Sequence, residues 1–274
     1  MFNQLEILSD EQSEKLYTIR KYIKNLESVC IAYSGGVDST LVASLAFEQL
    51  GSKAIAITGI SPALANTLRE EARRQAKWIG VKHLEIKTSE LAQPSYSENP
   101  KDRCFACKKE LHKHTTFLSK KLNNKIVLDG VNLDDLKDYR PGIQASKQAG
   151  VHSPLAKYKF SKKDIRDISR ALGFPWWDKP AQPCLSSRFP YGHEITSARL
   201  KMVEKAEEYL KECGLSEVRV RCQGSTARIE IPKDELKHFF NKYNFSEIVH
   251  YFSNLGFNCT SLDLEGLISG KLNR

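Results

Sequence analysis

A chain of 274 residues, 41% hydrophobic and 27% charged, has the composition of a globular protein with one large domain or two small ones. Its formal net charge of +9 favours an anionic partner such as a phosphorylated ligand, although Lys and Arg are spread along the chain. With no run of 18 apolar residues and no signal-like start, we expect a cytoplasmic protein without a membrane segment. Seven cysteines, an odd number without regular spacing, argue against a disulfide framework and favour metal or sulfur chemistry.

The first elements in chain order are a helix and a strand that leads into a glycine loop. Apolar residues at helical spacing predict a helix that begins near Ser9 or Asp10. A β-rich run at 29–33 then precedes the sequence Ser-Gly-Gly-Val-Asp-Ser at 34–39, and a helix closed by Gly51 follows. A strand, a glycine turn and a helix N-terminus together form a phosphate cradle.

The residue types in this loop suit a nucleotide. Gly35 and Gly36 carry no Cβ and can take φ > 0, so backbone N–H groups can approach an anion closely. Ser34 and Ser39 add hydroxyl donors, and Asp38 can hold Mg²⁺ against the same phosphates. An ordinary strand-to-helix turn is the alternative, but the whole string is more specific than a glycine pair. It is neither a Walker A motif nor a dinucleotide fingerprint.

Strands and helices then alternate up to about residue 175. Ser61 and Pro62 are expected to start the next helix, which Gly80 closes. The expected elements here are strands at 54–58, 83–86 and 126–129, an irregular stretch at 93–100 and a helix at 105–122. This alternation predicts an α/β fold, a doubly wound parallel sheet covered on both faces, with ligands at the C-terminal ends of the strands.

Polar residues follow the fourth strand, at the same sheet edge as the glycine loop. Asp129 and Gly130 are candidates for nucleotide or metal contacts, with a capped turn as the alternative; Asn132, Asp134 and Asp135 follow at the same edge. Further along, a short helix is expected from 140–142 and a fifth edge strand at 152–155. The expected helix after that is capped by Ser161 and runs to Gly173.

From 174 to 191 the composition shifts to prolines, tryptophans and a polar run that cannot form one regular element. A helix at 196–213, two strands at 217–222 and 227–231, two helical segments and a last strand near 257–264 make a small α+β domain. The expected division is an ATP-binding domain at 1–175, a catalytic loop and linker at 176–194, and a substrate-binding domain at 195–274.

Three cysteines stand in unusual contexts. Cys104 and Cys107 form a C-x2-C pair at the start of a predicted helix, where thiol pKa values are depressed. Cys184 lies in the proline-rich stretch, where no core position is expected. The remaining cysteines are expected to be packing residues: Cys30, Cys213, Cys222 and Cys259.

The loop at 34–39 resembles the pyrophosphatase loop of the PP-loop ATPases, which cleave ATP between its α and β phosphates. Together with Asp129-Gly130-x-Asn132 and the stretch at 183–192, it is similar to the LarE-type ATP-dependent sulfur transferases over nearly the whole chain. Those enzymes insert sulfur into pyridinium-3,5-biscarboxylate mononucleotide during nickel-pincer cofactor biosynthesis. The resemblance implies that a carboxylate is adenylated with ATP and Mg²⁺, and that Cys184 supplies or carries the sulfur.

The extra cysteine pair distinguishes this chain from the simplest members of the family. In those members the cysteine that matches Cys184 gives up its sulfur and becomes dehydroalanine. Other members hold a [4Fe-4S] cluster on three cysteines, and Cys104, Cys107 and Cys184 fit that arrangement. Three thiolates leave one iron able to bind hydrosulfide and deliver it. We favour the cluster over the sacrificial cysteine, and we expect the three thiols to meet above the C-terminal edge of the sheet.

The second half contributes the expected substrate site. Val218, Val220 and Cys222 are expected to point inward on their strand, with Arg219 and Arg221 outward, a geometry suited to a phosphate. By resemblance, Arg219, Arg221, Glu230 and Glu207 match substrate-phosphate and metal-contacting positions, with Glu208 as the alternative to Glu207.

The expected nucleotide contacts are Ser34, Gly35, Gly36, Val37, Asp38, Ser39, Thr58, Asp129 and Gly130. The expected catalytic residues are Cys184, Cys104, Cys107 and Asp38, and the substrate contacts are Ser187, Arg188, Glu207, Arg219, Arg221 and Glu230.

Three other functions stay open. A PP-loop tRNA thiolase would share the adenylation and the cluster, but no RNA-binding module with aromatic platforms is visible, so a nucleic-acid partner is not expected. An amide-forming synthetase would not need the cysteine trio, and a regulatory module would not need a complete loop. We expect a small nucleotide substrate and a homo-oligomer; the sulfur donor is not indicated.

Overall fold

The computed structural model describes residues 2, 4–122, 125–137, 140–268 and 270–271, and within them the chain forms two compact units. The first unit comprises residues 1–90 and 104–182, and the second comprises 91–103 and 183–274. The segment 91–103 therefore belongs with the C-terminal part of the chain, although it is flanked in sequence by the first unit. In the part of the chain that the structure describes, no helix is long and apolar enough to cross a membrane.

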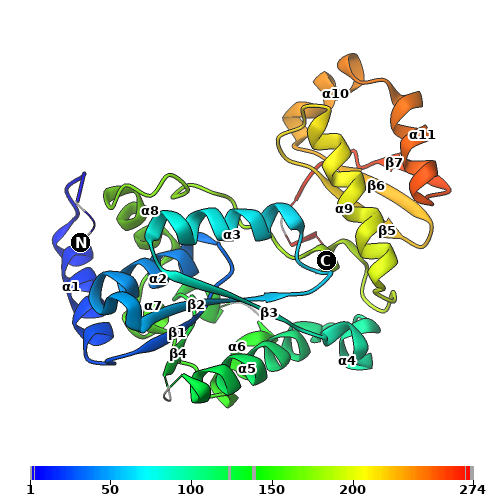
Figure 1. The fold of residues 1–274 in the computed structure, drawn as a ribbon. Helices are drawn as coiled ribbons and strands as arrows, with labels where there is room; N and C mark the ends of the chain where they lie inside the picture. Colours follow the sequence, from blue (N-terminus) through cyan, green and yellow to red (C-terminus); the bar gives the residue numbers. More distant parts are fainter. Residues whose placement is uncertain (1, 3, 123–124, 138–139, 269, 272–274) are drawn as a thin grey trace. The chain divides into compact units, whose positions relative to one another are not determined.

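The first unit contains a parallel sheet of four described strands in the order β3-β2-β1-β4 (Figure 1). Their bounds are Val29–Ala32 for β1, Ala54–Ile60 for β2, Lys82–Lys87 for β3 and Ile126–Leu128 for β4. In register, Val29 lies opposite Ala54 on one side and Ile126 on the other. The helices are α1 (Asp10–Lys24), α2 (Val37–Leu50), α3 (Asn66–Ile79), α5 (Arg103–Lys121), α6 (Pro141–Gln148), α7 (Pro154–Lys157) and α8 (Lys162–Ala171).

Both faces of this sheet are covered because the strands are apolar on both sides. Val29 and Ile31 of β1 pack into a large core with residues of α1, α2, α3 and α8. Cys30, between them, points to the other face and packs with residues of β2 and β4 and with side chains from α5. Since successive side chains of a strand point to opposite faces, this pattern places helices on both sides. The predicted α/β architecture is confirmed at this level, and it is compatible with a doubly wound fold.

Two local predictions in the first unit are wrong. The stretch 152–155 is not a strand: His152 makes an isolated bridge to Leu128, and Pro154 begins α7. Proline has no N–H for a ladder, and its fixed φ suits the first turn of a helix. Ser61 does not cap the following helix either, because its side chain accepts from the backbone of Ala63 in a preceding turn. The α3 helix begins five residues later, at Asn66.

The helix starts that carry clear capping signals are confirmed. Ser9 caps α1 and Ser161 caps α8, and each forms a reciprocal capping box with the residue three positions later. Gly51 and Gly80 lie at the ends of their helices, as expected. These local motifs are predictable because side chain and backbone partner lie within one helical turn.

The second unit holds a three-stranded sheet in the order β5-β6-β7, with β5 and β6 antiparallel and β6 and β7 parallel. The strands are β5 (Arg219–Gln223), β6 (Thr226–Glu230) and β7 (Cys259–Leu262). The helices are α4 (Pro94–Ser97), α9 (Ser197–Glu212), α10 (Leu236–Lys242) and α11 (Phe245–Leu255). The α9 helix packs on β5 and α11 packs on α9 and β7. The segment expected to be irregular at 93–100 therefore contains the short helix α4.

Candidate functional site

The glycine loop between β1 and α2 has the geometry of an anion site. Gly35 has φ +73°, and a Cβ there would lie 3.1 Å from the backbone of Ala72. Gly36, whose φ is −73°, caps α2 without a side chain, so no side-chain cap occupies the first N–H groups of the helix. Free N–H groups and the helix dipole favour a negative charge at this point.

Ser34 and Ser39 close the loop on itself. The Ser39 hydroxyl lies 3.1 Å from that of Ser34, donates to the carbonyl of Gly36 at 3.1 Å and accepts from the backbone N–H of Ser34 at 3.2 Å. Val37 and Ser39 are buried. Thr58 is buried too, and its hydroxyl donates to the carbonyl of Tyr33 at 2.8 Å. The serines thus fix the shape of the loop.

The turn after β4 packs directly against this loop, as the topology predicts. A Cβ on Gly130 would lie 2.7 Å from the backbone nitrogen of Ser39, so only glycine fits. Asn132 donates from its side-chain amide to Asp38 at 3.2 Å. The expectation that 129–132 shares an edge with the loop at 34–39 is confirmed, because parallel strands end at the same edge.

Asp38 has a cationic partner that sequence reasoning missed. The Lys162 ammonium donates to both carboxylate oxygens of Asp38, at 2.6 and 2.8 Å. Lys162 is the first residue of α8, and its backbone N–H donates to Asp134, which lowers the pKa of that carboxyl. The one available signal was the Ser161 capping box, which fixes where α8 starts.

Asp129 supplies a buried oxygen without a partner. Its residue is 4% exposed, and one carboxylate oxygen accepts from the backbone N–H of Val131 at 3.2 Å. The other oxygen is buried and has no hydrogen-bond partner among the described residues. An orphaned buried carboxylate oxygen needs a ligand, and Mg²⁺ prefers such oxygens. Burial, together with the nearby Asp38 charge, raises the pKa of Asp135 in the same cluster.

The cysteine pair lies at the start of α5 in the first unit. Cys104 is exposed and Cys107 is half-buried. Their i, i+3 spacing places both thiols on one face of the first turn. A Cβ on Gly142 would lie 2.9 Å from the side chain of Lys108, so α6 begins against this turn. Among the described residues no three His, Cys, Asp or Glu side chains form a ready metal-binding group, and the predicted meeting with Cys184 stays a prediction.

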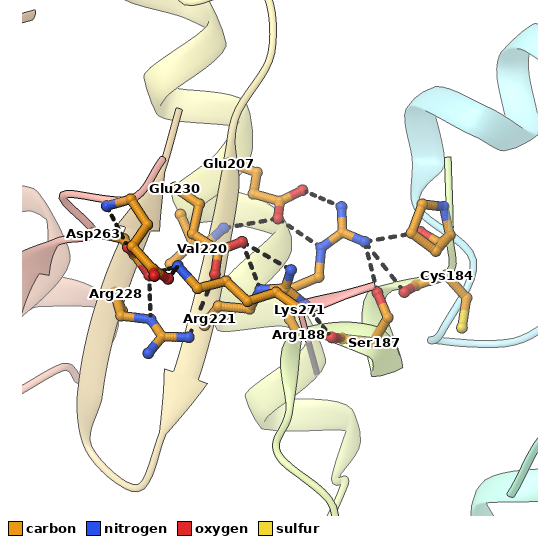
Figure 2. Close-up of polar contacts among 12 residues, drawn as sticks. Cys184, Ser187, Arg188, Glu207, Val220, Arg221, Arg228, Glu230, Asp263 and Lys271 are labelled. Carbon is orange, nitrogen blue, oxygen red and sulfur yellow. Dashed lines mark hydrogen bonds and ion pairs between the residues drawn. The ribbon is translucent and has the colours of Figure 1, made fainter. Parts of the chain in front are cut away.

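Cys184 is exposed at the start of a 3-10 turn, Leu185–Arg188, in the second unit. The Arg188 side chain holds this turn from within: its Nη1 donates to the carbonyls of Pro183 at 2.9 Å and Cys184 at 3.3 Å and to the Ser187 hydroxyl at 3.0 Å. Figure 2 shows these bonds converging on the segment that carries the thiol.

The segment 91–103 supports the same turn from another side. The Tyr96 hydroxyl lies 2.6 Å from that of Ser186, and the Asn99 amide donates to the carbonyls of Phe189 and Pro190 at 3.2 and 2.7 Å. Asn99 is buried with φ +56°, a conformation that asparagine tolerates better than most residues. Sequence reasoning missed both residues, because these contacts span about 90 positions.

Buried ion pairs surround this turn. Glu207 binds Arg188 through two bonds of 2.8 and 3.0 Å and also accepts from the Val220 N–H at 2.9 Å. Burial lowers the pKa of Arg188, but the Glu207 carboxylate outweighs it, so the pKa lies above its ordinary value. Glu230, fully buried, binds Arg221 at 2.8 Å. The structure thus places Glu207, rather than Glu208, in the cluster.

Arg221 lies on the expected face of β5, opposite to that of Val220 and Cys222, but it is not exposed there. Val220 and Cys222 are buried as predicted, but Arg221 is buried as well, because Glu230 and the carbonyl of Ser187 cover its guanidinium. Cys259 departs in the opposite direction: it is exposed at the start of β7 rather than packed in a core. An outward-facing strand position is exposed only where no other segment covers it.

Among the described arginines of this turn and β5, Arg219 is the one without a carboxylate partner. It is half-buried, and its side chain makes no hydrogen bond or ion pair with the described part of the chain. Burial and the neighbouring Arg188 and Arg221 charges lower its pKa. A cation among cations is stabilised by an anionic ligand, which makes Arg219 the best candidate in this unit for a phosphate contact.

The neighbouring strand β6 carries a further charged group, in which Arg228 lies directly opposite Arg221. Arg228 lies 3.4 Å from Glu230 and 3.3 Å from Asp263, and Lys271 lies 2.6 Å from Asp263 (Figure 2). Glu230 therefore pairs with arginines of both neighbouring strands, Arg221 of β5 and Arg228 of β6. Because its carboxylate serves both arginines, its charge is needed inside the protein whether or not a ligand binds.

No protein-family model matches the chain. It is 52% identical over 260 residues to an uncharacterized protein of Synechocystis, covering 95% of this chain and 97% of that protein. It is 33% identical over 247 residues to an uncharacterized protein of Methanocaldococcus jannaschii, covering 90% and 93%. Over 262 residues, 94% of each chain, it is 33% identical to the pyridinium-3,5-bisthiocarboxylic acid mononucleotide synthase of Lactiplantibacillus plantarum. The chain, with its glycine loop and its cysteine turn, therefore belongs to the family of that synthase.

Proposed function

We propose that this protein is an ATP-dependent, AMP-forming sulfur transferase that converts a carboxylate of pyridinium-3,5-biscarboxylate mononucleotide to a thiocarboxylate. The identity to the Lactiplantibacillus plantarum synthase over 94% of the chain carries this proposal, since that enzyme is named for the bisthiocarboxylic product. The chemistry of the two candidate sites supports it.

The first half-reaction is adenylation. The substrate carboxylate attacks the α-phosphorus of ATP, the bond to the β-phosphate oxygen breaks, and pyrophosphate leaves. The open helix N-terminus of α2 would receive the phosphates, and Lys162 would exchange its bond to Asp38 for a phosphate oxygen. Mg²⁺ fits the residues present, because Asp129 holds a buried oxygen that lacks a partner among the described residues and Asp38 adds a second carboxylate. The metal would neutralise phosphate charge.

The second half-reaction replaces AMP by sulfur. A sulfur nucleophile attacks the acyl carbon, a C–S bond forms and AMP leaves with the carboxylate oxygen. Arg219, which lacks a carboxylate partner among the described residues, would hold the phosphate of the mononucleotide. Cys184 is exposed on a firmly held turn, as a residue that carries sulfur must be.

The sulfur has two possible routes. In the route we favour, Cys104, Cys107 and Cys184 would hold a [4Fe-4S] cluster, and three protein thiolates would leave one iron able to bind an external sulfide. The exposed thiol of Cys104 at the N-terminus of a helix fits a metal thiolate. In the alternative route, the Cys184 sulfur itself attacks the acyl carbon and AMP leaves. Loss of the Cα proton of Cys184 then breaks the Cβ–S bond, so that the sulfur stays on the substrate and the residue becomes dehydroalanine.

Product analysis tests the proposal. The protein is incubated with ATP, Mg²⁺, sulfide and pyridinium-3,5-biscarboxylate mononucleotide, and nucleotides and products are identified by mass spectrometry. Pyrophosphate, AMP and a thiocarboxylate are expected; ADP and phosphate would refute the assignment. A tRNA thiolase would instead incorporate sulfur into RNA, and an amide-forming synthetase would require ammonia.

The iron content and the mass of the protein distinguish the two sulfur routes. The cluster route predicts about four irons per chain after anaerobic reconstitution, and a loss of iron on changing any one of the three cysteines to alanine. The sacrificial route predicts that the protein loses about 34 Da, the mass of H₂S, after one turnover, with Cys104 and Cys107 dispensable.

A further inference from the structure

Arg188 makes more polar contacts to the turn that carries Cys184 than any other side chain does. We define the Cys184 turn as residues 183–189. Besides the bonds internal to its 3-10 turn, the Ser187 N–H donates to the carbonyl of Cys184 at 3.0 Å and the Phe189 N–H donates to that of Ser186 at 3.3 Å. Leu185, Ser186 and Phe189 are buried, whereas Pro183 and Cys184, which precede the 3-10 turn, are exposed. The exposed part of the turn is therefore the part that side-chain donors to the carbonyls of Pro183 and Cys184 restrain.

Arg188 supplies these donors. Its Nη1 reaches three acceptors of the turn, while its Nε and Nη2 bind the two oxygens of Glu207 (Figure 2). The residue is 7% exposed, and every nitrogen of the guanidinium has a partner within the protein. An arginine engaged in this way has no free edge for a ligand, in contrast to Arg219.

Arg221 makes a second, shorter connection to the turn. Its Nη1 donates to the carbonyl of Ser187 at 2.6 Å, and its Nε binds Glu230 at 2.9 Å. Each arginine is thus held by its own buried carboxylate and donates its remaining edge to the turn. The planar guanidinium is suited to this use because both edges are fixed together.

We infer that Arg188 is a positioning residue for Cys184: the Arg188–Glu207 pair holds the Cys184 turn in the conformation that presents the thiol. The role that follows for the reaction rests on the proposed function of Cys184 as the residue that carries sulfur. The inference replaces the expected direct contacts of Arg188 and Glu207 with substrate by an action through the turn, because both Glu207 oxygens bind groups of the protein.

The test is hydrogen exchange of the Ser187 and Phe189 amides in the full chain. Arg188→Ala alone would leave the buried Glu207 carboxylate without a partner and endanger folding. The informative variant is therefore R188M/E207Q, in which the carbonyl oxygen of the new side-chain amide still accepts from the Val220 N–H and no charge is left unpaired. R20M/E48Q is the matched control, because Arg20 and Glu48 form a pair with the same two distances, 2.8 and 3.0 Å, in the first unit.

In R188M/E207Q, we expect exchange at the Ser187 and Phe189 amides to rise about 10- to 150-fold, the effect of one lost charge-assisted hydrogen bond. The amides that pair β5 with β6 should be unchanged, and R20M/E48Q should leave the turn unaffected. R188K, which keeps one donor, should restore part of the protection. Unchanged exchange in the turn, or an equal rise throughout β5 and β6, would overturn the inference.

A comparison of two rates, pyrophosphate release and thiocarboxylate formation, completes the test. R188M/E207Q should release pyrophosphate at the rate of the unaltered protein and form thiocarboxylate at least about tenfold more slowly, the lower end of the effect expected on the turn. Equal loss of both rates would contradict a role confined to the turn. If the unaltered protein makes no thiocarboxylate at all, the proposed function fails, while the exchange result still decides whether Arg188 fixes the turn.

Discussion

The two candidate sites differ in how their charges are paired. Around the glycine loop of the first unit, carboxylates dominate: Asp38 is shared by Lys162 and Asn132, and Asp129 keeps a buried oxygen without a partner among the described residues. Around the Cys184 turn of the second unit, cations dominate, and Arg219 is the one without a carboxylate among the described arginines of that turn and β5.

This difference indicates what each site lacks. The first site has a helix N-terminus beside acidic side chains, and we propose that it binds a phosphate and a cation together. The second has a surplus cation and would be completed by an anion. The following predictions test this contrast, from the largest expected effect to the smallest.

Glu230 tests whether the second unit needs its carboxylates. Glu230→Ala should destabilise this unit by about 3–5 kcal/mol, because it leaves the buried Arg221 and the half-buried Arg228 without their shared partner. Urea unfolding monitored separately in the two units would measure this effect. A change below about 1 kcal/mol, the size of a surface ion pair, would show that the cations do not depend on Glu230.

Asp38 tests the metal and phosphate interpretation of the first site. Asp38→Asn should slow pyrophosphate release by at least about 100-fold, since a metal contact to the phosphates is worth several kcal/mol. The folded state should be preserved, because the new side-chain amide still offers an oxygen to the Asn132 donor. Pyrophosphate release at the unaltered rate would remove Asp38 from the reaction.

His112 provides a pH test within the first unit. It is 1% exposed, and burial lowers its pKa to about 4 from 6.5. Because the unfolded state takes up a proton that the folded state excludes, the free energy of unfolding should fall as the pH drops from about 6.5 to about 4. The loss is at most about 3 kcal/mol. H112Q should flatten this dependence, and an equally steep curve in that variant would assign it to other groups.

Arg219 tests the surplus cation. Arg219→Gln should weaken binding of the mononucleotide substrate about 10- to 150-fold, with ATP affinity unchanged. The free energy of unfolding should stay the same or rise slightly, since the variant removes repulsion from Arg188 and Arg221. Calorimetric titration and thermal unfolding check the two parts; a loss of stability would mean that Arg219 has a structural role.

Much of the first site could be predicted from the sequence because its parts are local. Gly35, Asp38 and Ser39 lie within one turn of the loop and helix that they form, and Gly130 follows from the rule that parallel strands end together. Lys162 could not be predicted, because its bond to Asp38 joins positions 124 apart and depends on where α8 lies.

The second site was harder to predict for the same physical reason. The alternation along β5 and β6 was correct, but the burial of Arg221 depends on the turn that covers it, and Tyr96 and Asn99 reach that turn from a distant segment. Strand alternation determines which side chains share a face, and tertiary packing determines whether that face is covered.

The sequence by itself determined the alternation of strands and helices, the capped helix starts, the glycine loop and the resemblance to a sulfur-transferase family, since each is expressed over short spans of chain. Only the tertiary structure decided which charges are paired: Asp38 with Lys162, Arg188 with Glu207 and Arg221 with Glu230. Coulomb attraction acts through space and depends on burial, so residues distant in sequence become partners only when the fold brings them together.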